Sequence, residues 1–149
     1  MSMNKFYLKR FILCGILGWS MECFWTGLAS IVFTSNRTFP CQTSMWMFPI
    51  YGMAVLILPL SKKLNGKSMI QRGGIYTVLI FLVEFLTGSI LKFFDACPWD
   101  YSDARLQFMG VIRLDYAPLW FIMGLLFEKI LIESEHWEYF QKKQHTTKQ

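Results

Sequence analysis

The chain has 149 residues, of which 54% are hydrophobic and 17% aromatic, and its mean hydropathy is +0.34. A soluble domain of this size needs a largely polar surface, so the composition indicates a polytopic membrane protein. The net charge of +5 does not indicate nucleic-acid binding, because basic residues commonly flank membrane helices and no ordered basic and aromatic module is present. The cysteine and histidine spacing matches no metal-ligand set.

The first predicted membrane helix covers residues 11–33, and its only charged residue is Glu22, at the midpoint. A helix of that length covers about 34 Å, enough to cross a hydrocarbon core of roughly 30 Å. Small and polar residues recur along it at three- and four-residue spacing, so we expect Glu22 to face protein rather than lipid. An uncleaved helix is preferred over a signal peptide, because Glu22 interrupts the run and more apolar runs follow.

Three further apolar runs follow. Residues 45–60 form a short one, with Pro49 expected in the first helical turn, and a re-entrant segment is the alternative to a full crossing. Residues 74–94 form a third span with Glu84 near its middle, and residues 116–132 form the fourth. The sequence therefore predicts an all-α protein with four transmembrane helices.

Four crossings place both termini on one side of the membrane. That side carries eleven of the fifteen basic residues, so the positive-inside rule predicts cytoplasmic termini and a multi-pass protein of a bacterial plasma membrane. Residues 1–132 form one predicted domain, and 133–149 a charged cytoplasmic tail whose end is expected to be disordered.

The cysteines lead to one hypothesis. The topology places Cys41 and Cys97 together on the outer side, where a disulfide is chemically permitted. The sequence cannot show whether their Cα atoms are close enough, so the bond stays a hypothesis. Cys14 and Cys23 are expected to be packing residues.

Six short motifs occur in order along the chain: Gly18 to Glu22, Asn36-Arg37, Pro49 to Gly52, Glu84 to Gly88, Trp99 to Ser102, and Gly110 to Leu114. This series resembles the CmpB-like family of ABC-transporter type IV permeases, which are small bacterial membrane proteins. The resemblance covers about residues 15–126. It implies a transport function.

The chain departs from the family pattern at three places. Thr38 stands where the family usually has glycine, Met45-Trp46 stands where it has Gly-Pro, and the arginine expected directly after Gly110 is absent. The chain also lacks a phosphate-binding G-x-x-x-x-G-K-[ST] loop, so an ABC function requires a separate ATPase subunit. Four helices are few for a transport path, so a homo- or hetero-oligomer is expected.

The candidate site combines the motif residues that have chemical capacity. Acids inside a membrane bind cations or relay protons, and an outer cluster of Arg, Asp and Tyr can hold a headgroup or solute. The structural alternatives are a protonated acid bonded to a neighbouring helix, an interfacial loop, and a salt bridge from Arg37 to Asp100 or to lipid phosphate. No catalytic, cofactor or metal ligand is predicted, and the candidate ligand or ion path consists of Glu22, Glu84, Arg37, Tyr51, Trp99, Asp100, Tyr101 and Arg113.

Three functions are compatible with these residues. The favoured one is a membrane component of a transport system, with Glu22 and Glu84 lining a solute or proton path. A non-catalytic scaffold or regulatory subunit is the second. The third is a membrane enzyme acting on a lipid-linked substrate, with Asp100 or a glutamate as general base and Arg37 on phosphate. An enzyme is less favoured, because no Ser-His or Cys-His pair is available and both histidines lie on the inner side.

Overall fold

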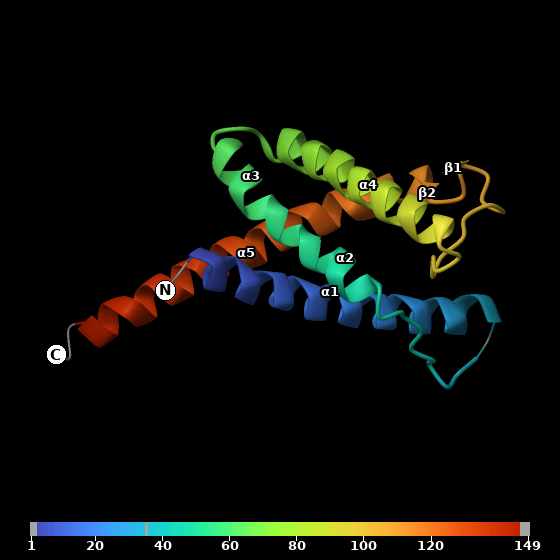
Figure 1. Ribbon diagram of the computed structural model, residues 1–149, viewed down its shortest axis with the longest axis horizontal. Coiled ribbons are helices and arrows are strands. Elements are labelled where there is room, and N and C mark those ends of the chain that lie inside the picture. The colour runs from blue at the N-terminus through green and yellow to red at the C-terminus, as the bar shows by residue number, and fades with distance from the viewer. Residues whose placement is uncertain (1–2, 35, 147–149) are drawn as a thin grey trace.

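The protein is mostly helical (74%), as predicted. The computed structural model describes residues 3–34 and 36–146, and the predicted disordered end, 147–149, lies outside the described residues. The elements in chain order are α1 (Met3–Thr34), α2 (Met47–Gly52), the 3₁₀ helix η1 (Met53–Leu56), α3 (Ile57–Lys63), α4 (Met69–Phe93), β1 (Gln107–Phe108), β2 (Ile112–Arg113), the 3₁₀ helix η2 (Leu114–Tyr116) and α5 (Ala117–Thr146) (Figure 1).

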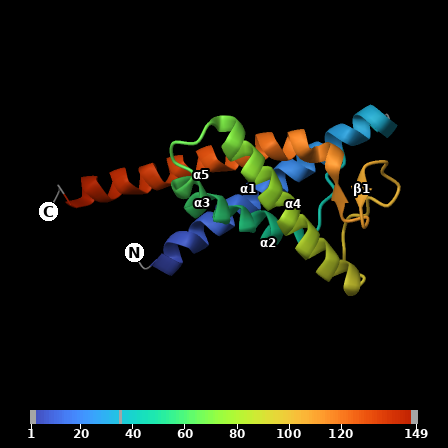
Figure 2. The ribbon, with the colours of Figure 1, turned by 90° about the horizontal axis from the view of Figure 1, so that it is seen from above.

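The helices form two pairs. The run from α2 to α3 returns along α1, while α4 packs against α5 (Figures 1 and 2). Small residues permit the close approach within each pair: Gly15 lies against Phe48, and Gly124 of α5 lies against Tyr76 of α4. The C-terminal end of α5 projects past the other helices near the N-terminus, and the β-hairpin lies at the opposite end.

Within the described residues, two helices are long and apolar enough to cross a membrane by length and composition, α1 and α4. Only 22% and 17% of their apolar windows are buried inside the protein, so neither is the buried core helix of a soluble domain. Their outward faces expose large apolar side chains such as Phe24, Val32, Val78 and Ile90. Contiguous apolar surface of this kind is expected where lipid covers it. The crossings by residues 45–60 and 116–132 stay predictions.

The second apolar run is helical but irregular. Pro49 lies in the first turn of α2, as predicted. Pro59 lies inside α3 and has no N–H for the carbonyl of Val55, and the tighter η1 helix occupies that preceding turn. The irregularity therefore has a sequence cause, since a proline disturbs the turn before it.

Local signals explain where the last two long helices begin. The Ser68 hydroxyl accepts a hydrogen bond from the Gln71 backbone, and the Gln71 side chain accepts one from the Ser68 backbone, which is a capping box at the start of α4. Pro118 lies in the first turn of α5. The segment 95–115, predicted only as a polar loop, contains an antiparallel hairpin with Phe108 opposite Ile112.

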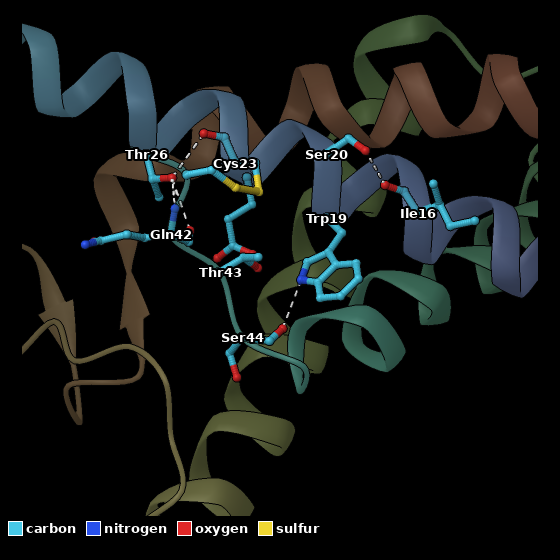
Figure 3. Close-up of a disulfide and its surroundings, with 10 residues drawn as sticks. Ile16, Trp19, Ser20, Cys23, Thr26, Gln42, Thr43 and Ser44 are labelled. Atoms are coloured by element: carbon cyan, nitrogen blue, oxygen red, sulfur yellow. Dashed lines mark hydrogen bonds between the residues drawn. A yellow bond between two sulfur atoms is a disulfide. The ribbon is translucent and has the colours of Figure 1, made fainter. Parts of the chain in front are cut away.

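The predicted cysteine pairing is wrong. The disulfide joins Cys23 to Cys41, with their Cα atoms 4.4 Å apart, whereas Cys14 and Cys97 are free. The reason is the path of the 36–46 loop, which turns back along α1 instead of staying beyond the helix end (Figure 3). Cys23 is therefore a cross-link rather than only a packing residue.

Residues 133–146 of the charged tail continue α5 as a helix. The acids of α5 pair with basic residues of α1 and α3. Glu135 meets Lys62 at 2.6 Å, and Glu138 meets Arg10 at 3.3 Å. Arg10 is only 2% exposed and stacks on the Phe6 ring at 3.5 Å.

A second buried acid of α5 joins it to α4. Glu128 is 5% exposed, accepts a hydrogen bond from the Tyr76 hydroxyl at 2.6 Å and pairs with Arg72 at 3.1 Å. Removing one partner of a buried pair leaves the other charge uncompensated, which is more costly than losing an exposed pair. This contact is therefore expected to stabilise the α4–α5 pair strongly.

We expect Cys23 and Cys41 to be recovered as one disulfide-linked peptide pair from protein alkylated and digested without reductant. Cys14 and Cys97 should carry the alkyl label. Because the bond closes a loop with a sequence separation of 18, Cys41→Ser should lower the free energy of unfolding by about 3 kcal/mol. A peptide linking Cys41 to Cys97 in the mass spectrum would contradict this arrangement.

Glu128→Gln should destabilise the protein by roughly 2–3 kcal/mol, because it leaves Arg72 without a carboxylate partner. The matched control is Glu133→Gln on the same helix, where the side chain is 67% exposed and its Lys129 partner is 4.0 Å away. That change should stay within about 0.5 kcal/mol. Unfolding both variants with a denaturing detergent measures the difference in stability. Equal losses of stability in the two variants would contradict the expected contribution of the buried Glu128–Arg72 pair.

Candidate functional site

A cavity of about 840 Å³ lies between the α1–α2 side of the protein and the α4–α5 side. Five predicted site residues line it: Glu22 from α1, Tyr51 from α2, Glu84 from α4, and Trp99 and Tyr101 from the loop after α4. Its volume lies within the range of roughly 300–1,000 Å³ typical of small-molecule sites. The cavity is therefore the candidate functional site.

Glu22 is held by the loop that the disulfide ties to α1. The Thr43 hydroxyl donates to Glu22 Oε2 at 2.6 Å. Either side of this contact, the Thr26 hydroxyl exchanges hydrogen bonds with the Gln42 backbone at 3.1 Å, and the Trp19 indole donates to the Ser44 carbonyl at 3.0 Å (Figure 3). These contacts make the loop part of the cavity wall.

Glu84 is in a different situation, although it lines the same cavity. Its side chain is buried, and its Oε2 atom has no hydrogen-bond partner among the described residues. The Tyr101 hydroxyl and the Trp120 indole approach its carboxyl group. The indole Nε1 of Trp120 is itself buried without a hydrogen-bond partner in the described part of the chain. Glu84 thus keeps bonding capacity that the protein does not use.

Aromatic side chains complete the wall, and glycines position two of them. A Cβ atom at Gly18 would overlap the Tyr51 ring, and a Cβ atom at Gly88 would lie 3.0 Å from the Trp99 ring. Trp99 is also held by a hydrogen bond from its indole to the Val111 carbonyl at 3.1 Å. Both glycines therefore permit an aromatic ring to lie against a helix.

A row of aromatic rings leads from the loop to α5. Tyr101 packs edge-on against Tyr116 with centroids 5.9 Å apart, and Tyr116 packs against Trp120 at 6.1 Å. Burial raises the pKa of Tyr101, and the nearby Glu84 carboxylate adds to the rise. Tyr101 is therefore a neutral hydroxyl that can donate a hydrogen bond beside Glu84.

Charged residues at and beside the β-hairpin pair with one another. Asp100 accepts hydrogen bonds from the Ser102 hydroxyl at 2.6 Å and from Lys92 at 3.1 Å. Gly110 lies here with φ +65°, and a Cβ atom on it would lie 2.5 Å from the Lys92 ammonium nitrogen, so glycine is required both by conformation and by space. The side-chain bonds from Ser102 and Lys92 lower the pKa of Asp100 to about 2.

Arg113 forms a second local pair. It donates to both carboxylate oxygens of Asp115, at 2.9 and 3.0 Å, and lies over the Tyr116 ring at 4.6 Å. The Asp115 side chain raises the pKa of Arg113, and Arg113 lowers the pKa of Asp115. Arg113 reaches the cavity only indirectly, through its contact with Tyr116.

A comparison with protein families matches residues 9–148 to the family described as "Putative ABC-transporter type IV". The chain belongs to this family. No solved structure matches the chain. The family and the two apolar helices together make this an ABC-transporter-associated membrane protein.

The match includes the motifs on which the predicted resemblance rested, and the structure gives several of them a physical role. Gly18, Gly88 and Gly110 each lie where a larger residue would meet a neighbouring side chain. The first two support rings of the cavity, and the third closes the hairpin around Asp100. The motifs that contain Gly18 and Gly88 thus lie at the cavity, and the motif that contains Gly110 lies beside Asp100 in the loop after α4.

Three predicted site residues lie outside the cavity lining: Arg37, Asp100 and Arg113. The alternative of an Arg37–Asp100 salt bridge is wrong, because Asp100 pairs with Lys92. Arg37 is exposed in a turn in which the Asn36 side chain accepts from the Thr38 backbone at 3.0 Å. The predicted outer cluster is therefore divided among separate local pairs.

Sequence reasoning missed Thr43, Tyr116 and Trp120 as lining residues. No sequence signal identifies Thr43, because its role depends on the backward path of the loop. Trp120 follows the last family motif closely, and its position one turn into α5 was the available clue. Among the described residues, no group of three or more His, Cys, Asp or Glu side chains is placed to hold a metal ion.

The lowered pKa of Asp100 gives a pH prediction for the outer hairpin. The value of about 2 lies below the ordinary 3.8, so the contribution of Asp100 to stability is present above about pH 4 and is lost as the pH falls through about 2. In NMR of carboxyl-labelled protein, the Asp100 resonance, assigned with Asp100→Asn, should stay unchanged from pH 7 to pH 4. Lys92→Met should move its midpoint towards 3.8. A wild-type midpoint near 3.8 would contradict these hydrogen bonds.

Proposed function

We propose that this chain is the membrane component of a transport system in which Glu22 and Glu84 line a path for a solute or a proton. The observation that carries the proposal is that two acids from different helix pairs open on the same cavity. An acid that faces a cavity at membrane depth is typical of a cation or proton site. The family to which the chain belongs supports the transport role.

The proposed topology has four crossings, with both termini in the cytoplasm of a bacterial cell and the chain in its plasma membrane. The basic residues that end α3 and begin α4 support this orientation, since Lys62 and Arg72 contact α5 near the end where the N-terminus also lies. Positive charge of this kind favours the cytoplasmic face. The outer hairpin and the disulfide then lie towards the oxidising side of the membrane.

The energy source is proposed to be a separate ATPase subunit. The chain carries no phosphate-binding loop of its own, so nucleotide hydrolysis requires a partner. The site also lies between only two helix pairs, and apolar side chains of α1 and α4 face outward. A homo- or hetero-oligomer is therefore proposed as the transporting unit.

A non-catalytic scaffold or regulatory subunit is the second candidate. Glu22 favours it, because its carboxylate already has a partner in Thr43 and a protonated acid or an amide could make the same contact. Nothing favours the enzyme alternative comparably. Asp100, its candidate base, is bound by Ser102 and Lys92 and does not line the cavity.

Glu22→Gln and Glu84→Gln, singly and together, should keep the folded yield in detergent but abolish complementation of a deletion host. The amide preserves side-chain size and removes the charge on which a cation or proton path depends. Glu84→Gln should have the larger effect, because Glu84 has the unused oxygen. Glu133→Gln, on the exposed face of α5, is the control and should complement fully.

The opposite result separates the two candidates. Full complementation by the double variant would show that both acids are packing groups, and the scaffold function would replace the transport path. Loss of folded yield would also assign them a structural role. In that case the test moves to Glu84→Asp, which keeps the charge and should restore function only if the charge is needed.

A further inference from the structure

The cavity is lined by acids and by no basic side chain of the described residues. Among the described residues that line it are two carboxylates, Glu22 and Glu84, and no lysine, arginine or histidine. Two basic residues near the cavity already have carboxylate partners, since Lys92 pairs with Asp100 and Arg113 pairs with Asp115. In a site shielded from water, unpaired negative charge attracts a cation far more strongly than it would at the surface.

The wall of the cavity is rich in aromatic rings. Rings of Tyr51, Trp99, Tyr101, Tyr116 and Trp120 line it. A cation over the face of a tryptophan or tyrosine ring gains roughly 0.5–2 kcal/mol, with the larger value where water is excluded. A cationic ligand would therefore be attracted by the rings as well as by the acids.

Much of the rest of the wall is apolar and adaptable. Four methionines line the cavity: Met21, Met47, Met53 and Met123. Methionine side chains adjust to irregular apolar ligands, which is why they are common at promiscuous binding surfaces. The volume of about 840 Å³ exceeds the need of a bare inorganic ion, and the described residues offer no cluster of three or more metal-binding side chains.

One buried group points into this space. Glu84 is 9% exposed, and its Oε2 atom has no hydrogen-bond partner among the described residues. Leaving a buried polar atom without a hydrogen-bond partner is costly, so a site that keeps one is expected to complete it with a ligand. Glu22, held by Thr43, gives a second carboxylate at the opposite wall.

We propose that the cavity binds an amphipathic organic cation, with its charged centre between Glu84 and the aromatic rings and its apolar body against the methionines. The inference rests on the proposed transport function and names the substrate class of that same site. Anions are excluded by the two acids, and strongly polar neutral solutes by the apolar wall. The cation can come from a free solute or from the ammonium headgroup of a lipid, since both present the same chemistry.

The test uses two probes of matched shape and opposite charge, tetraphenylphosphonium and tetraphenylborate. Equilibrium binding to the full chain in uncharged detergent should detect the cation, and the anion should bind at least about tenfold more weakly, a difference of about 1.4 kcal/mol. This comparison needs no variant, so it cannot fail through misfolding. Equal binding of the two probes would overturn the proposal.

Variants then assign the charge to the acids. Glu84→Gln should weaken tetraphenylphosphonium binding at least about tenfold and Glu22→Gln less, while Glu84→Asp should retain most of the affinity, because an ionised partner is kept. Glu133→Gln should bind as the wild type does. Unchanged binding by the double Glu22→Gln, Glu84→Gln variant would place the probe elsewhere and overturn the inference.

Competition distinguishes the two sources of the cation. Displacement of the probe by phosphatidylcholine, but not by phosphatidylglycerol, would identify a lipid headgroup, and an absence of displacement by either would identify a free solute. The two proposals also fail separately. If the probes do not bind but both glutamine variants abolish complementation, the organic cation is wrong and the path through Glu22 and Glu84 stands.

Discussion

A polar or charged group that is buried away from water needs a partner from the protein. Three acids on the helices of this chain have such partners to different degrees. Glu128 is fully engaged by Tyr76 and Arg72, and Glu22 accepts one bond from Thr43. Glu84 keeps a buried oxygen without a partner among the described residues. The acid with the most hydrogen-bond partners, Glu128, thus lies outside the cavity, and the acid with an unbonded oxygen, Glu84, lines it.

The same requirement for a partner applies to the N–H and C=O groups of the backbone. The 36–46 segment is not helical, yet it lies beside the middle of α1, a position tolerated where protein buries the chain or a cavity receives it. Thr26 and Trp19 bind its carbonyl groups, and the Cys23–Cys41 bond fixes its position along the helix. The loop therefore has the properties of a cavity wall rather than of an external connection.

Sequence patterns predicted what depends on one helix at a time. The long apolar runs and the inward face of Glu22 follow from periodicity and composition, and Glu22 lines the cavity. What the sequence could not provide was the return path of a loop or the partner of a charge. Cys41 joins Cys23 instead of Cys97, and the acids of α5 bind Lys62 and Arg10, because both results depend on how separate segments meet.

The ion pairs of α5 and the residues that line the cavity therefore lie at different positions along the helices. Ion pairs join α5 to α1, α3 and α4 at the end of the helices near the N-terminus. The cavity lies farther along, where the rings of Tyr101, Tyr116 and Trp120 pack the loop after α4 against α5. A chain of marginal stability can keep an unsatisfied acid only if contacts elsewhere offset the cost. Helix packing has to offset that cost here, because the ion pairs of α5 with Lys9 and Lys62 are exposed and contribute little, and the unused oxygen of Glu84 stays available to a ligand.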